Sequence, residues 1–263
     1  MGMADPPKPL FPDKRRRFFG ANIDLLTMEE SLKAVDPIID RRVPVQHVGV
    51  NVSKLILMKE DPALAEMVNA CPIINVDGQG VVWGGRWLGF PIPERVTGID
   101  LFVLLIEHAA RKGYKVYFLG AREEMVKKTV ESFLKDHPDL RVVGWRNGYF
   151  KDEEEAGIVQ QIRRSGADML FVAMTSPKKE YFLTKYLNEM NVPFAMGVGG
   201  SFDVIAGMTI RAPLWVQRIG FEWFFRLINE PRRLWKRYLS TNLIFAWMLF
   251  KAALLGKKRY DCD

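Results

Sequence analysis

An aspartate at position 77 has the surroundings that acid–base chemistry needs in an α/β protein. A short apolar run at 73–76 ends at Asp77, and Gly78 follows directly. Ligands of open α/β sheets collect outside the carboxyl ends of the strands, so a carboxylate at a strand end is placed to act as a general base. The same carboxylate would suit a cap for the helix that follows. Spacing alone leaves both roles open.

Three further turns place glycine or proline next to polar residues directly after an apolar run, at 119–122, 175–180 and 197–203. Each would present backbone N–H groups at a helix N-terminus, a geometry that binds phosphates. Neither a Walker A sequence nor a clean G-x-G-x-x-G is present, which disfavours kinases and dehydrogenases. The expected phosphate contacts in these turns are Gly120, Ala121, Pro177, Lys178, Glu180, Gly199, Gly200 and Asp203.

Metal chemistry and covalent catalysis find no support in the sequence. The three histidines are scattered, no Cys/His pair has ligand spacing, and no nucleophile elbow occurs. The one Asp-x-Asp motif is the last three residues, 261–263, where the chain should fray. We therefore expect no metal ion and no other cofactor. The charge of a leaving group would be neutralised by Arg95 and by arginines near the C-terminus.

The elements that must position these residues alternate between apolar runs and amphipathic segments. Such alternation with short links predicts a mainly parallel sheet covered by helices. Strands are expected at 19–26, 45–50, 73–76, 114–121, 140–145, 168–174 and 192–198, and helices at 53–70, 99–112, 122–136, 152–164 and 176–190, with a capping box at 27–30.

Composition indicates a folded soluble protein of 263 residues, with 48% hydrophobic and 26% charged residues. Two cysteines suit a reducing compartment, and the first residues do not resemble a signal peptide. We expect a flexible cytoplasmic arm at 1–17, a catalytic domain at 18–207 and a basic, amphipathic, helical appendage at 208–263.

The positive charge of the chain is concentrated in the appendage. Residues 211–260 hold eleven Lys/Arg against two acidic residues, together with four of the seven tryptophans. Its apolar run, 243–255, is shorter than the roughly 20 residues that cross a bilayer. Aromatic and basic residues on helices suit a membrane interface. An ordinary helix pair packed on the domain and a nucleic-acid surface are the alternatives, and the tryptophan-rich stripe favours lipid.

Six motifs occur in order along the chain. They are VDGxGVV at 76–82, PERVTGxD at 93–100, SPKKE at 176–180, GVGGxFD at 197–203, RAP at 211–213 and EWxxRLxxEPxR at 222–233. Together they resemble the WecG/TagA/CpsF family of bacterial glycosyltransferases (glycosyltransferase family 26). The resemblance runs from about Phe18 to about Tyr238.

This resemblance implies a Rossmann-like α/β fold of the GT-E type and a metal-independent, inverting reaction. A UDP-sugar would donate to a sugar on an undecaprenyl-diphosphate carrier, at the inner face of the bacterial membrane. Asp77 would deprotonate the acceptor hydroxyl. The resemblance implies substrate contacts from Asn51, Arg95, Thr97, Asp100 and Lys179, and donor diphosphate contacts from Arg211, Arg226, Arg233 and Lys236.

Two positions depart from the family pattern. Gly49 stands where members that transfer N-acetylmannosamine often have threonine, and Lys179 replaces the usual glutamine. We interpret both as favouring an unsubstituted hexose, with glucosyl transfer in xanthan- or acetan-type exopolysaccharide assembly as the first expectation. N-acetylmannosaminyl transfer of teichoic acid or enterobacterial common antigen type is the alternative.

A basic membrane- or nucleic-acid-binding module without catalysis is the second alternative, although we expect no nucleic-acid partner. Self-association is a further expectation, because an apolar appendage must be covered when no membrane is present.

Overall fold

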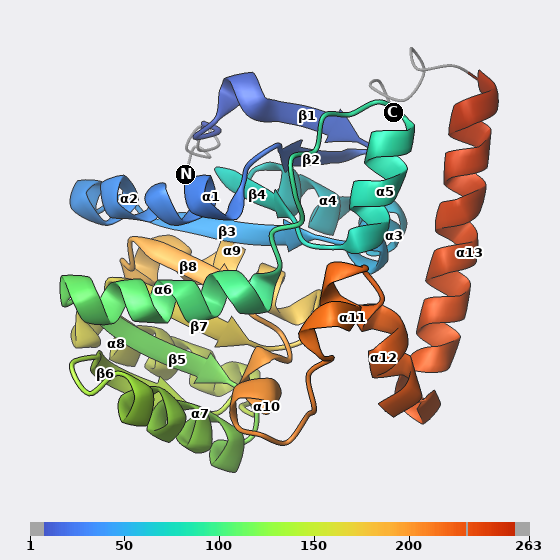
Figure 1. Ribbon diagram of the computed structural model, residues 1–263. Coiled ribbons are helices and arrows are strands. Elements are labelled where there is room, and N and C mark those ends of the chain that lie inside the picture. Colours follow the sequence, from blue (N-terminus) through green and yellow to red (C-terminus); the bar gives the residue numbers. More distant parts are fainter. Residues whose placement is uncertain (1–7, 230, 256–263) are drawn as a thin grey trace.

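The computed structural model describes residues 8–229 and 231–255 (Figure 1). Its centre is a six-stranded sheet in the order β4-β3-β8-β7-β5-β6, with all neighbouring strands parallel. Strand β7 is buried at every position, as expected where helices cover both faces. The predicted fold class is therefore confirmed. The strands are β3 (Val45–Val50), β4 (Ile73–Val76), β5 (Lys115–Gly120), β6 (Arg141–Arg146), β7 (Met169–Ala173) and β8 (Phe194–Gly197).

One face of the sheet is covered by helices that pack around Phe102. Its ring contacts the rings of Phe118, Phe133, Phe171 and Phe202, with centroids 4.7–6.3 Å apart. These contacts join two helices to two strands and to the start of a third helix. The helices of this face are α1 (Met28–Lys33), α2 (Val35–Arg41), α6 (Gly98–Lys112), α7 (Glu123–Asp136) and α10 (Ser201–Ile205).

The other face has two apolar clusters, one under α3, α4 and α5 and one under α8 and α9. The prediction of a single helix at 53–70 is wrong, because the structure has two helices there. Pro62 begins a new helix and Asp61 caps it, accepting from the backbone N–H of Leu64, so the segment divides in two. The helices are α3 (Val52–Glu60), α4 (Pro62–Asn69), α5 (Gln79–Trp87), α8 (Glu155–Ser165) and α9 (Lys178–Met190), with the turn η2 (Asp152–Glu154) before α8.

A hairpin of β1 (Arg15–Phe18) and β2 (Ala21–Asp24) follows the short turn η1 (Pro12–Lys14). The strand expected at 19–26 is therefore shorter, because Phe19 and Gly20 adopt left-handed conformations and form the hairpin turn. Residues 12–17, which we expected in a flexible arm, belong to these elements. The capping box at Thr27 and Glu30 is present as predicted.

The appendage forms α11 (Leu214–Arg218), α12 (Glu222–Asn229) and α13 (Pro231–Leu255). In Figure 1, α13 runs along one side of the molecule. Phe245 and Leu249 of α13 pack on Gly84 of α5, where an added Cβ would lie within 3 Å of both side chains. Within the described ranges, no helix has both the length and the apolar character that a membrane crossing requires.

Candidate functional site

Asp77 directly follows β4 at the carboxyl edge of the sheet. Its backbone N–H donates to the Val50 carbonyl at 2.9 Å, and its Oδ1 accepts from the backbone N–H of Gly98 at 2.8 Å. Gly78, not Asp77, is the N-cap of α5, so the capping alternative is wrong for the following helix. Asp77 instead binds the first N–H group of α6. Its Oδ2 accepts no hydrogen bond from the described part of the chain.

Two glycines bring neighbouring backbone close to Asp77. A Cβ on Gly49 would stand 3.1 Å from Asp77 Cβ and 3.6 Å from Oδ2, and a Cβ on Gly78 would stand 2.8 Å from Asn51 Cβ. Asn51 caps α3, since its Oδ1 accepts from the backbone N–H of Lys54 at 3.0 Å. The structure therefore brings the two expected residues Asn51 and Asp77 close together.

The N-terminal turn of α6 connects Asp77 to the appendage. Thr97 caps this helix, and its hydroxyl donates to the carboxylate of Asp100. Nη2 of Arg211 lies 2.7 Å from Asp100 Oδ1 and its Nε lies 3.7 Å from Glu222 Oε1, while Nη2 of Arg95 lies 3.4 Å from Glu222 Oε2. The expected residues Arg95 and Arg211 thus meet at a glutamate of α12, and Arg211 connects this glutamate to Asp100 and Thr97.

A second charged cluster is buried between α3 and the start of α9. The ammonium groups of Lys54 and Lys179 both contact Oε1 of Glu180 and the hydroxyl of Ser176. Burial, followed by the charge of Lys54, lowers the pKa of Lys179 to about 8. Burial acts to raise the pKa of Glu180, but the two ammonium groups outweigh it and the pKa lies below its ordinary value.

Sequence reasoning missed Lys54. Its side chain is almost fully buried, and it lies one helical turn before the buried Met58. A lysine on the apolar face of a helix is the signal that could have identified it, because such a group needs a buried counter-charge.

The phosphate-suited turns all lie at the carboxyl edge. Gly120 has φ +127°, and a Cβ there would stand 2.5 Å from the backbone of Ala173, so the ends of β5 and β7 require glycine at this point. From β5 the chain continues to β6 on one side, and from β7 to β8 on the other. This divergence is the switch point at which open α/β sheets bind ligands.

The turn after β8 meets the appendage. The guanidinium of Arg226 reaches within 3.7 Å of the Cβ position of Gly200, whose neighbours are the expected residues Gly199 and Asp203. An arginine of α12 therefore lies beside a turn that was predicted to bind phosphate.

Other expected contacts lie elsewhere. Lys178 is exposed, with its ammonium 4.9 Å from the ring centroid of Phe150, and Lys236 is exposed, with its ammonium 5.6 Å from the ring centroid of Trp235. The side chain of Arg233 and the Asp-x-Asp motif at 261–263 fall outside the described residues. In the part of the chain that is described, no group of three or more His, Cys, Asp and Glu could hold a metal ion.

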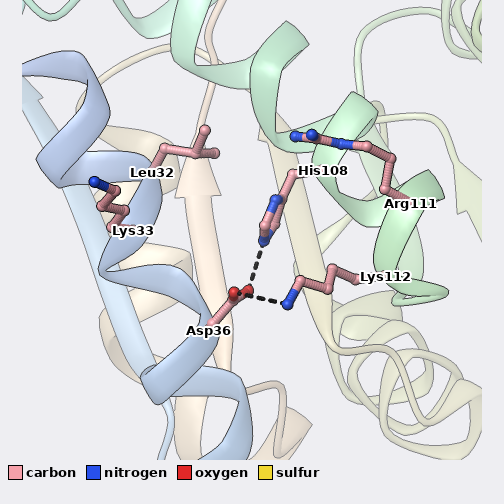
Figure 2. A pocket seen from close by; sticks show the side chains of 6 residues that line it. All are labelled: Leu32, Lys33, Asp36, His108, Arg111 and Lys112. Carbon is pink, nitrogen blue, oxygen red and sulfur yellow. Dashed lines mark hydrogen bonds and ion pairs between the residues drawn. The ribbon is translucent and has the colours of Figure 1, made fainter.

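A hollow of about 360 Å³ lies between α1, α2 and the C-terminal half of α6 (Figure 2). Asp36 is its central charge, and His108 at 2.6 Å, Tyr114 at 2.9 Å and Lys112 at 3.3 Å already contact this carboxylate. Because α6 begins at the carboxyl edge beside Asp77, its other end and this hollow lie away from the candidate site.

The chain is similar to known proteins over most of its length. The model of the family described as "Glycosyl transferase WecG/TagA/CpsF family" matches residues 16–259. Two relatives share the name N-acetylglucosaminyldiphosphoundecaprenol N-acetyl-beta-D-mannosaminyltransferase. The protein of Bacillus spizizenii (strain ATCC 23059 / NRRL B-14472 / W23) is 36% identical over 181 residues, 69% of each chain. That of Bacillus subtilis (strain 168) is 33% identical over 202 residues, 77% of this chain and 78% of the relative.

Proposed function

Because the chain belongs to the WecG/TagA/CpsF family of glycosyl transferases, we propose that it moves a sugar from a UDP-sugar to a saccharide on an undecaprenyl-diphosphate carrier. The names of both relatives state an acceptor of this kind. The observation that carries the proposal is the placement of Asp77. One carboxylate oxygen is held by the N–H of Gly98, and the other is open at the carboxyl edge.

In the proposed reaction Asp77 is the general base. The acceptor hydroxyl loses its proton to Oδ2 of Asp77 while its oxygen attacks the anomeric carbon, and the bond from that carbon to UDP breaks with inversion. Negative charge then moves from the carboxylate to the departing diphosphate. The turn at Gly199 and Gly200, together with Arg226, supplies N–H groups and positive charge for this leaving group without a metal ion.

N-acetylmannosamine is the sugar that the comparisons favour. Both relatives are named as transferring it to N-acetylglucosaminyl-diphospho-undecaprenol. The expectation of glucose depended on Gly49 and Lys179 alone, and the relatives' names support the alternative better. We therefore propose N-acetylmannosaminyl transfer, with glucosyl transfer as the second candidate because those two residues lie in or next to the site.

We further propose that α13 lies on the inner membrane surface. It buries Phe245 and Ala252 against the catalytic domain, while a stripe of large apolar side chains on its opposite side is exposed. A helix that is apolar on both sides needs a second apolar surface. The stripe consists of Leu239, Leu243, Trp247, Phe250 and Leu254.

The test is UDP release with defined donors and lipid-linked acceptors. We expect turnover with UDP-N-acetylmannosamine and N-acetylglucosaminyl-diphospho-undecaprenol, and much less with UDP-glucose. Asp77→Asn should lower kcat by about 10²- to 10⁴-fold, since a positioned base contributes this much. Asp40→Asn, at an exposed position of α2, is the matched control. No transfer from any UDP-sugar, or full activity of Asp77→Asn, would contradict the proposal.

A further inference from the structure

Arg95 and Arg211 meet at Glu222 with contacts too long for strong hydrogen bonds. The two nitrogen–oxygen distances to the glutamate are 3.4 Å and 3.7 Å, whereas charge-assisted hydrogen bonds measure about 2.7–2.9 Å. The side chains are largely buried, with exposed fractions of 15% for Arg95, 25% for Arg211 and 17% for Glu222. One carboxylate is therefore shared by two arginines and satisfies neither.

Arg211 shows most clearly that its donors lack well-aligned acceptors. Its Nη2 is close to Asp100 at 2.7 Å, but the contact is an ion pair without hydrogen-bond alignment. Nε and Nη2 are both shielded from solvent and have no hydrogen-bond partner within the described ranges. Buried donors without partners are unfavourable and rare in native structures. A phosphate group has more acceptor oxygens than a carboxylate and could satisfy both arginines.

We propose that Arg95 and Arg211 form a binding site for a substrate phosphate group, and that Glu222 occupies this site as an internal competitor in the substrate-free protein. The proposal rests on the proposed function for the identity of the ligand, the diphosphate of a nucleotide-sugar or of a polyprenyl carrier. Glu222 must leave when the phosphate enters, because both need the same guanidinium groups.

The position of the site connects it to catalysis. Asp100, the other partner of Arg211, bonds to Thr97, and the next residue, Gly98, donates its N–H to Asp77. A bound phosphate would therefore lie beside the turn that holds the base. Glu222 is also the first residue of α12, and Arg226 follows one helical turn later. Displacement of Glu222 would therefore change how the appendage is held on the domain.

Isothermal titration with inorganic pyrophosphate tests the competition. Glu222→Gln keeps the shape of the side chain and removes its charge, so we expect pyrophosphate to bind about tenfold tighter than to the wild type, and Arg211→Gln to bind at least tenfold weaker. Glu107→Gln, at an exposed position of α6, removes one negative charge elsewhere and should leave the affinity unchanged. Parallel titrations with UDP and with a short polyprenyl diphosphate identify the source, because of these two only the ligand whose diphosphate reaches Arg95 and Arg211 should gain affinity in Glu222→Gln.

Hydrogen exchange of α12 gives a second measurement. We expect its amides to exchange faster in the wild type at saturating pyrophosphate than without it. In the titration, Glu222→Asp has a shorter side chain, so its affinity for pyrophosphate should lie between those of the wild type and Glu222→Gln. If Glu222→Gln binds pyrophosphate no better than the wild type, or if exchange in α12 is unchanged, Glu222 only connects the appendage to the domain and the proposal is wrong. These titrations need no sugar transfer, so a failure of the proposed function would leave their outcome intact.

Discussion

Gly49 of β3 and Asp77, which directly follows β4, lie so close that the aspartate side chain leaves no ordinary space for a side chain at position 49. A Cβ there would stand 3.1 Å from Asp77 Cβ, below the usual 3.5–4.0 Å between carbon atoms. Since Oδ1 is held by Gly98 and Oδ2 faces position 49, Gly49 sets the space in which the proposed base works.

We therefore expect Gly49→Ala to displace the carboxylate and to lower kcat by about 10- to 100-fold, with a smaller change in KM, because small misplacements of a catalytic group are costly. Gly157→Ala is the matched control. It lies in α8 with no atom within 4 Å of the added Cβ, and should keep full activity with equal or higher stability. Equal activity of Gly49→Ala and wild type would show that Asp77 does not depend on this space.

The buried cluster at Glu180 predicts which of two variants loses more stability. Glu180→Gln leaves the ammonium groups of Lys54 and Lys179 without their shared counter-charge, whereas Lys54→Met leaves a simple pair of Lys179 and Glu180. We expect Glu180→Gln to lower the free energy of unfolding by about 3–5 kcal/mol, and Lys54→Met by less. Urea unfolding measures both, and the reverse order would contradict a net positive cluster.

His47 predicts an acid-sensitive stability. Burial lowers its pKa to about 4, and its Nε2 contacts Oδ1 of Asn75 at 2.6 Å, so the folded protein holds the neutral ring with Nε2–H donating. The unfolded chain takes up this proton near pH 6.5. Between about pH 6.5 and 4 the unfolded state therefore binds more protons, and stability falls as the pH is lowered. The loss should be on the order of 3 kcal/mol.

His47→Gln supplies the comparison, because its amide can still donate to Asn75. The difference in free energy of unfolding between wild type and variant should shrink as the pH falls from 7 to 4. A difference that stays constant over this range would contradict a neutral buried His47.

The exposed stripe of α13 predicts binding to membranes. Leu243→Gln with Trp247→Gln removes two of its large apolar side chains, and we expect most of the protein to be lost from floated anionic liposomes, since burial of apolar side chains and positive charge act together. Tyr149→Gln removes an even more exposed aromatic side chain from the catalytic domain, and this variant should float like wild type. Unchanged flotation of the double variant would place the contact on another surface.

Much of the site could be predicted because its determinants are local. A strand that ends at Asp77, glycine turns after buried strands and a capping box at Thr27 are each contained in a few consecutive residues. The break at Pro62 was also readable, but the apolar spacing across it favoured one helix. The family motifs then connected these local features, and the matched family agrees with them.

Contacts between distant segments were not predictable in this way. Lys54 and Glu180 are 126 residues apart in the chain, and their pairing depends on how α3 packs against α9. Sequence alone determined the strand-end position of Asp77 and the positive charge of the appendage, because both are properties of short segments. Only the tertiary structure decided that Asp77 binds the N–H of Gly98 instead of capping α5, and that Glu222 lies between Arg95 and Arg211. The pairing of buried charged side chains depends on how whole helices pack against one another. That packing leaves no local pattern in the sequence.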